Sequence, residues 1–390
     1  VSMLKRCYKT EENFPSTAEV ALLHSLEQGF NKFPEKIVDF CRHFLLDCGW
    51  LANKIFNSIK QNGGNYNFKN GEDLNFQYFY EENYENIYSD ETKRKAKPAF
   101  DKMQKAFRDN NIKLSTHYAL LSFDIDNLGK WLAGDFIKNE EETKDFHEVL
   151  AEKLKEFTEE TQNIITDDKG RIIYNGGDDF LALVNLHYLF EVVNELQNKF
   201  NAIVNSSGLT KYFKNQADKI TISFGITVAH YKTPLNEVLK NAKLMLEEAK
   251  EFHSDKASTG IIYMTHSSII GKTIFRNTDF QVFELLENTF KEGKINNKFY
   301  HVFGRELMPI AGEIPDNTDY DNLIKISRTE LLRIMKRGKT KEVQKEIETD
   351  IFPPLFEKIL LTNTNNEDFS IENFLGFAKI ADKLASNLRK

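Results

Sequence analysis

The spacing of hydrophobic positions changes along the chain and predicts three regions. From Glu19 to about Ile59 the apolar residues recur at helical spacing, and the stretch 61–72, with three glycines, is typical of a loop. A basic segment near residues 93–107 again has the pattern of a helix. We therefore expect residues 1–115 to form a helical domain.

The middle region, residues 116–272, alternates short apolar runs with amphipathic stretches. The runs that predict strands are 118–124, 171–174, 180–184, 220–229 and 261–264. Helical patterns fill the longer gaps, whereas the second and third runs are separated only by a tight turn. The resulting order is β-α-β-β-α-β with one extra terminal strand, which is the split ferredoxin-like arrangement.

After about Thr273 the apolar spacing is helical throughout. Residues 273–390 are therefore expected to form a C-terminal helical bundle, with one helix split at Pro353-Pro354. The predicted fold class is α+β: a ferredoxin-like palm (βαββαβ) flanked by an N-terminal helical domain and a C-terminal helical bundle.

Carboxylates gather where the first and third predicted strands meet the same edge. Asp124 ends the first strand, and Asp178 and Asp179 follow a Gly-Gly pair in the turn before the third. These strands are neighbours in this topology, so the clusters should converge. Like charges held that close are costly unless cations neutralise them, and carboxylates with substrate phosphates suit Mg²⁺ or Mn²⁺. Asp126 is expected to turn away from Asp124, either as a solvent-facing helix cap or as a ligand.

Neighbouring residues suit a nucleoside triphosphate such as ATP. Gly176 and Gly177 lack side chains, so a base or ribose could approach the turn closely. Asn127 and Gly129 open a helix whose amides could face a phosphate, and Lys250 is a candidate phosphate contact. Each feature also has a simpler explanation: Gly-Gly-Asp-Asp is common in turns, and Lys250 is one of several lysines on its helix.

Composition narrows the class of protein. The 390 residues include 52 basic and 59 acidic side chains, for a formal net charge of −7, and 41% are hydrophobic, as in ordinary globular proteins. No run approaches the ~18 apolar residues of a membrane span. Three cysteines (Cys7, Cys41, Cys48) form no Cys-x-x-Cys pair, which favours a reduced, cytoplasmic protein. The net charge argues against a chain that holds nucleic acid mainly through its own charge.

Four motifs together resemble a known family. They are Phe-Asp-Ile-Asp-Asn-Leu-Gly-Lys (123–130), Asn-Gly-Gly-Asp-Asp-Phe (175–180), Ile-Ser-Phe-Gly-Ile (222–226) and His-Tyr-Lys-Thr-Pro-Leu (230–235). As a set they resemble the polymerase/cyclase palm of the large subunit of type III CRISPR effector complexes, the "Cas ten" family. Lys5-Arg6 with the segment 14–20 is similar to the Cmr (type III-B) branch. The HD nuclease, first palm and zinc knuckle of that family are not in this sequence, so we expect a fragment.

The resemblance implies a function and a set of site residues. It implies a palm that polymerises ATP into cyclic oligoadenylate second messengers when the complex binds target RNA. Its implied metal ligands are Asp124, the Ile125 carbonyl, Asp178 and Asp179. Ser223 would touch the base and Lys250 a phosphate. The implied partners are other Cmr subunits, the CRISPR guide RNA and target RNA.

Two other functions stay open. The same palm could join AMP to another adenosyl acceptor such as S-adenosylmethionine, or the chain could be a non-catalytic scaffold that binds ATP. The basic residues 336–339 suit contact with RNA or a small helical subunit, but they also suit an ordinary solvated helix end. A diguanylate cyclase fits less well, because the glutamate that usually follows Gly-Gly-Asp is Asp179 here.

Overall fold

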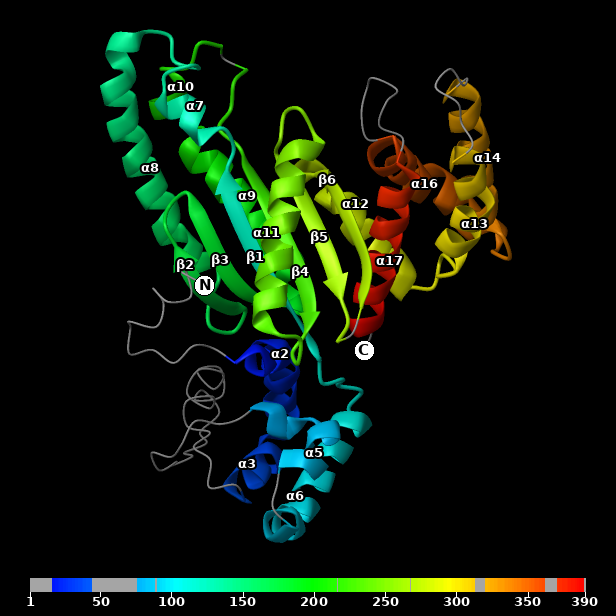
Figure 1. Ribbon diagram of the computed structural model, residues 1–390. Helices are drawn as coiled ribbons and strands as arrows, with labels where there is room; N and C mark the ends of the chain where they lie inside the picture. The colour runs from blue at the N-terminus through cyan, green and yellow to red at the C-terminus, as the bar shows by residue number, and fades with distance from the viewer. Residues whose placement is uncertain are drawn as a thin grey trace.

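A computed structural model describes most of the chain. The described residues are 16–43, 76–87, 90–215, 217–266, 268–312, 320–361 and 370–388. They form an α+β fold in which one six-stranded sheet lies between two helical regions (Figure 1). Cys41 is buried, whereas Cys7, Cys48, the motif before residue 16 and the predicted loop at 61–72 lie outside the described residues.

The sheet contains the predicted ferredoxin-like core. Its strands are β1 (His117–Ile125), β2 (Gly170–Asn175), β3 (Asp179–Asn185), β4 (Ile222–His230), β5 (Ser258–Met264) and β6 (Ile269–Arg276). They lie in the order β2-β3-β1-β4-β5-β6. β1 pairs antiparallel with both β3 and β4, so the predicted adjacency of strands one and three is confirmed. β5 then joins β4 in parallel, through the crossover helix α11 (Leu235–Phe252).

The sixth strand was not predicted. The expectation of helix alone after Thr273 is wrong at its start, because β6 pairs antiparallel with β5 as far as Arg276. Gly271 and Lys272 interrupt the alternation of apolar residues in this segment, which hides it in the sequence. Its pairing with a strand that precedes it directly in the chain is what makes it a strand.

Helix α17 (Ile371–Leu388) covers the outer edge of β6. The Asn373 side chain accepts a hydrogen bond from the Ile274 amide at 2.7 Å and donates one to the Ile274 carbonyl at 2.8 Å. Gly376 lies so close to the Lys272 carbonyl that a Cβ atom there would collide with it. The unpaired backbone groups of an exposed strand edge can pair with another chain. Here the Asn373 side chain instead forms hydrogen bonds with the amide and carbonyl of Ile274.

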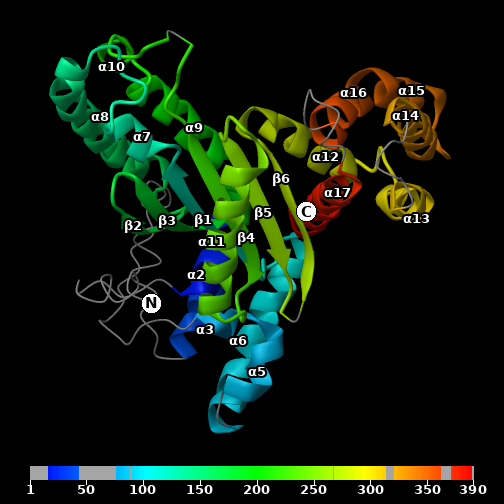
Figure 2. The ribbon, with the colours of Figure 1, turned by 45° about the horizontal axis from the view of Figure 1, so that its top comes forward.

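The two faces of the sheet belong to two cores, because alternate residues of a strand point to opposite faces. The helices on one face are α8 (Thr143–Ile164), α9 (Leu189–Val204), α12 (Phe280–Lys291) and α17. The other face packs against α11 and the N-terminal helices (Figure 2). Along β1, Phe123 and Ile125 point into the first core and Tyr118 and Leu120 into the second.

The N-terminal region is helical, as predicted. Its elements are α2 (Thr17–Lys32), α3 (Pro34–His43), η2 (Phe76–Phe79), α5 (Glu81–Ile87) and α6 (Asp90–Asp109). Just after β4, Tyr231 stacks on Tyr80 with ring centroids 4.3 Å apart, and its hydroxyl donates to Glu82 at 2.7 Å. The last residue of β4 pairs with His117, the first of β1. The helical region is therefore attached at the end of the sheet opposite Asp124.

The C-terminal region is a helical bundle. Besides α12 and α17 it contains η5 (Asn277–Asp279), α13 (Phe299–Gly312), α14 (Tyr320–Lys336), α15 (Lys341–Glu346), η6 (Ile347–Ile351), α16 (Phe352–Leu355) and η7 (Phe356–Leu360). Pro353 and Pro354 stand in the first turn of α16, which continues directly from η6, so both prolines lie inside one continuous helical run. The expected split is instead a change to π-helical turns on both sides, in η6 and η7.

The remaining short helices surround the palm. They are α7 (Leu128–Leu132), η3 (Glu140–Glu142), η4 (Leu186–Tyr188) and α10 (Ser207–Thr210). In the part of the chain that the structure describes, none of the helices has the length and apolar character needed to cross a bilayer.

Candidate active site

Two carboxylates oppose each other on adjacent strands. Asp124 of β1 and Asp179 of β3 are direct partners in the antiparallel ladder. Such partners point to the same face, with their Cβ atoms about 4.5–5.5 Å apart. Burial, reinforced by the negative charges of Asp124 and Asp178, raises the pKa of Asp179. The two acidic clusters of the sequence thus converge at one edge of the sheet, and their charges repel.

Lysines of α11 face these carboxylates. The Lys250 Nζ atom lies 2.6 Å from Asp124 Oδ1, and the two side chains are 22% and 42% exposed. Lys243, seven residues earlier on the same helix face, acts with Lys250 to lower the pKa of Asp179, against the larger effect of burial. Sequence analysis did not identify Lys243, although its spacing from Lys250 was the available signal. Positive charge therefore covers the acidic edge from the helix side.

Two of the carboxylates at this edge suit a divalent cation. Across the described ranges, no three or more His, Cys, Asp or Glu side chains are arranged as a metal-holding group. The opposed pair, Asp124 and Asp179, supplies the hard oxygen ligands that Mg²⁺ prefers, and their repulsion is what such a cation would relieve. The two aspartates fit an ion whose other ligands are water and phosphate oxygens. Coordination by Asp178 and by the Ile125 carbonyl stays a prediction.

Asp126 has a structural role that the sequence analysis did not anticipate. The expectation of a solvent-facing cap is wrong, because this side chain is only 1% exposed. Its carboxylate accepts hydrogen bonds from the Thr221 hydroxyl at 2.7 Å, the Ser223 hydroxyl at 2.8 Å and the Ala257 amide at 3.1 Å. Asp126 therefore ties the end of β1 to the start of β4 and to the turn before β5.

Ser223 belongs to this buried network and not to an open site. It is the ladder partner of Asp124, but its side chain is fully buried and donates to Asp126. Its hydroxyl also accepts from the Ser258 amide at 3.4 Å. A base cannot reach an atom that is enclosed in this way, so the structure does not bring Ser223 to the candidate site.

Side chains are disfavoured at the two glycines of the β2–β3 turn for different structural reasons. Gly177 has φ +91°, a conformation that side-chain-bearing residues rarely adopt. A Cβ atom on Gly176 would collide with the Tyr174 ring. The Gly176 amide donates to the Asp179 carbonyl at 2.9 Å and closes the turn. The turn backbone itself thus favours glycine at position 177, whereas at position 176 the obstacle to a side chain is the Tyr174 ring.

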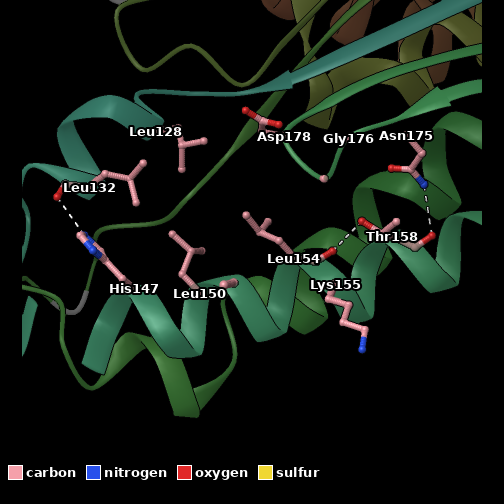
Figure 3. A pocket seen from close by; sticks show the side chains of 12 residues that line it. Leu128, Leu132, His147, Leu150, Leu154, Lys155, Thr158, Asn175, Gly176 and Asp178 are labelled. Atoms are coloured by element: carbon pink, nitrogen blue, oxygen red, sulfur yellow. Dashed lines mark hydrogen bonds between the residues drawn. The ribbon is translucent and has the colours of Figure 1, made fainter. Parts of the chain in front are cut away.

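A pocket of about 490 Å³ opens between this turn and helices α7 and α8 (Figure 3). Its residues are Leu128, Leu132, His147, Leu150, Ala151, Leu154, Lys155, Thr158, Asn175, Gly176, Gly177 and Asp178. Four leucines form an apolar wall opposite the turn, whose backbone forms the other side. Asp178 lines the pocket and also raises the pKa of Asp179, so the pocket adjoins the acidic edge.

Polar atoms hold the pocket walls in place. Asn175 donates from its side-chain nitrogen to the Thr158 carbonyl at 3.2 Å and to the Thr161 hydroxyl at 2.7 Å. This fixes the amide, and its oxygen is a buried acceptor without a hydrogen-bond partner in the described part of the protein. His147 Nε2 lies 2.9 Å from the Leu132 carbonyl and joins α8 to α7. Sequence analysis identified neither Asn175 nor the residues of α8 as part of a site.

The start of α7 forms one rim of the same pocket. Asn127 has φ +55°, and its carbonyl accepts from the amides of Lys130 at 2.9 Å and Trp131 at 3.1 Å. Gly129 is exposed, and a Cβ atom there would meet nothing within 4 Å. The structure thus places both residues beside Leu128 of the pocket wall, and their predicted contact with a phosphate stays a prediction.

Comparison with known proteins gives the palm a family. Residues 117–274 match the family described as Cas10/Cmr2, second palm domain. The chain is 26% identical over 291 residues to the CRISPR system Cmr subunit Cmr2 of Pyrococcus furiosus, a match that covers 68% of this chain. It covers 31% of the length of that relative.

Solved structures agree with the fold. The chain resembles a type III-B Cmr-beta chain in its apo state with a TM-score of 0.55 at 14% identity, over 96% of this chain and 47% of the other. A second, from type III-B Cmr-beta bound to cognate target RNA, matches with a TM-score of 0.56 at 15% identity, over 95% and 48% of the respective chains. The ferredoxin-like sheet and the acidic edge agree with the sequence match: residues 117–274 form a domain that matches the second palm domain of the Cas10/Cmr2 family.

Proposed function

We propose that this chain is the nucleotidyltransferase part of a type III CRISPR effector complex, and that its palm converts ATP into cyclic oligoadenylates when the complex binds target RNA. The observation that carries the proposal is the opposed pair Asp124 and Asp179, beside a pocket and beneath Lys250. Paired carboxylates at the edge of a palm suit metal-assisted phosphoryl transfer, in which catalysis consists of positioning and charge stabilisation.

Each part of the site has a role in this proposal. Asp124, Asp178, Asp179 and the Ile125 carbonyl would hold Mg²⁺, which would supply Lewis-acid stabilisation of the phosphates. Lys250 lies 2.6 Å from Asp124, within reach of a triphosphate at the same edge, and acts as a point charge for it.

The pocket takes the base of the nucleotide. Its volume of about 490 Å³ is in the range of ligand pockets, and its leucines offer an apolar surface to a ring. Leucines on one side and the turn backbone on the other would hold the base flat.

The names of the relatives support a set of partners. The Pyrococcus furiosus relative is named as a Cmr subunit, and one structural relative is a Cmr-beta assembly bound to cognate target RNA. We propose that this chain likewise acts with other Cmr subunits, a guide RNA and a target RNA, and that target binding activates the palm.

The test is product synthesis by the assembled complex. The complex containing this chain is incubated with target RNA, Mg²⁺ and labelled ATP, and the products are resolved by mass. Wild type should give cyclic oligoadenylates, and D178A/D179A should give none while the complex still assembles. A double variant at exposed carboxylates of α8, E152A/E159A, removes the same charge and should keep the activity.

Three results would contradict the proposal. Undiminished synthesis by D178A/D179A would show that the catalytic site is not at these aspartates of the palm. A product that forms only when S-adenosylmethionine is added would replace polymerisation of ATP by conjugation of AMP, and binding of ATP without any product would leave a scaffold.

A further inference from the structure

A cleft far from the palm is lined mainly by basic side chains. It has a volume of about 840 Å³ and lies along α14 and the start of α15. Its lining residues are Arg328, Thr329, Leu332, Arg333, Lys336, Arg337, Gly338 and Gln344. Figure 1 places α14 on the opposite side of the molecule from α8, which lines the nucleotide pocket, and Figure 2 shows α14 and α15 side by side. The cleft is therefore a separate site.

Charge is concentrated around this cleft. Residues 333–345 contain six lysines and arginines and one acidic residue, Glu342, although the whole chain has a formal net charge of −7. An acidic protein with such a local excess of positive charge presents it at one place on its surface. This is the distribution expected of a chain that contacts a polyanion locally and does not depend on overall charge.

Two of the cleft arginines have no carboxylate partner in the described ranges. Arg333 is paired with Glu330 at 2.6 Å, and Lys336 with Glu348 at 2.8 Å. By contrast, Arg328 lies over the rings of Phe352 and Phe356, at 6.0 and 5.6 Å from their centroids. Aromatic contact holds a guanidinium by its face and leaves its N–H edges available for hydrogen bonds.

The exposed Arg337 is the second of these arginines. It follows the last residue of α14 and precedes Gly338, whose φ is +74° and around which a Cβ atom would meet nothing within 4 Å. The backbone on this side of the cleft is thus open to close approach. Among the described residues, Arg328 and Arg337 are the two lining cations without a carboxylate partner.

The chemistry of the lining favours a nucleic-acid backbone over a protein helix. Grooves that take an amphipathic helix are apolar, whereas Leu332 is the one large apolar residue among those that line this cleft. Phosphates are bound by Arg and Lys together with Ser, Thr, Asn and Gln side chains, and Thr329 and Gln344 supply that neutral part. We propose that this cleft binds the phosphodiester backbone of single-stranded RNA, with Arg328 and Arg337 as the principal phosphate contacts.

The experiment measures RNA affinity as a function of salt. A fluorescein-labelled 20-nucleotide single-stranded RNA of mixed sequence is titrated with the full chain, and anisotropy is followed between about 0.05 and 0.2 M salt. For single strands each phosphate contact contributes a slope of about 0.7 in log K against log salt. Losing two contacts should lower the slope by about 1.4 and weaken binding about 25-fold at 0.1 M salt in R328Q/R337Q.

Matched variants separate the cleft from general charge. K105Q/R108Q changes two exposed cations of α6 and should keep the wild-type affinity and slope. R337Q alone changes an exposed side chain, so it keeps the fold, and it should give about half the change in slope. Because the assay contains no ATP or divalent metal, its outcome is independent of the proposed catalytic function.

Two outcomes would overturn the assignment. The first is an R337Q variant and an R328Q/R337Q variant that bind this RNA as K105Q/R108Q does. The second is displacement of the RNA by polyglutamate at the same concentration of negative charge, which would make the cleft a surface for acidic protein segments.

Discussion

Lys250 should compete with a divalent metal ion for Asp124. Its Nζ atom lies 2.6 Å from Asp124 Oδ1, so a cation that takes this oxygen as a ligand must first displace the lysine. The variant K250M keeps most of the length and apolar stem of the side chain and removes the charge. We therefore expect K250M to bind Mn²⁺ more tightly than wild type in the absence of nucleotide.

The size of the effect follows from the exposure of the pair. Lys250 is 22% exposed and Asp124 is 42% exposed, so water screens the ion pair, and such pairs contribute about 0.5–1 kcal/mol. At 25 °C this corresponds to a dissociation constant for Mn²⁺ that is about two- to fivefold lower in K250M. The same variant should bind ATP more weakly when metal is saturating, because the phosphates lose a charged contact.

Calorimetric titration with Mn²⁺ measures the first effect directly. The matched control is K240M, which removes an exposed charge from the same helix. K243M adds a sharper comparison, since Lys243 is 78% exposed and acts on Asp179 without an ion pair to it. If K243M tightened Mn²⁺ binding as much as K250M, general charge and not the contact with Asp124 would be responsible. Equal affinity in K250M and K240M would refute the competition outright.

Three further changes test the surrounding geometry. Burial and the neighbouring carboxylates raise the pKa of Asp179, so its ionisation destabilises the fold and the stability of the wild type falls as pH rises through that pKa. The variant D179N should therefore have a higher melting temperature than wild type at pH 7 but not at pH 3. An equal gain in melting temperature at both pH values would contradict this reasoning. G177A should lose about 1–2 kcal/mol in urea unfolding because its φ is +91°, whereas G129A should be nearly neutral; equal losses would argue against backbone strain. D126A leaves two hydroxyls and an amide without their acceptor and should lose about 3 kcal/mol or more, and a loss under about 1 kcal/mol would show that water replaces the carboxylate.

The central adjacency of the sheet could be predicted from local patterns. Short apolar runs, a two-glycine turn and helices of ordinary length leave few topologies, and the β-α-β-β-α-β order brings β1 beside β3. Asp124 and Asp179 then lie opposite each other because both stand at the same end of the antiparallel β1–β3 ladder. Their convergence therefore follows from chain order and strand alternation alone.

Contacts between distant segments could not be predicted in the same way. β6 is a strand because β5 pairs with it and because Asn373, about a hundred residues later, satisfies its outer edge. The pocket depends on where α8 lies against the β2–β3 turn, and no residue spacing in the sequence states that distance. The α8 leucines are what an amphipathic helix would bury in any core, so their periodicity does not mark a ligand wall.

Asp124 and Asp126 illustrate where sequence reasoning fails for a single residue. The expectation that alternation separates them was wrong, because residues i and i+2 of a strand point to the same face, and the Asp126 amide continues the pairing to the Thr221 carbonyl at 2.8 Å. Their environments differ for a reason that lies on β4. Thr221 and Ser223 donate hydroxyl hydrogen bonds to Asp126 and leave no ligand position there, whereas Asp124 is opposed by a carboxylate and a lysine. Of two acidic residues in one motif, one is therefore held by hydrogen bonds inside the fold, and the other lies opposite Asp179 and pairs with Lys250, which a metal ion would have to displace.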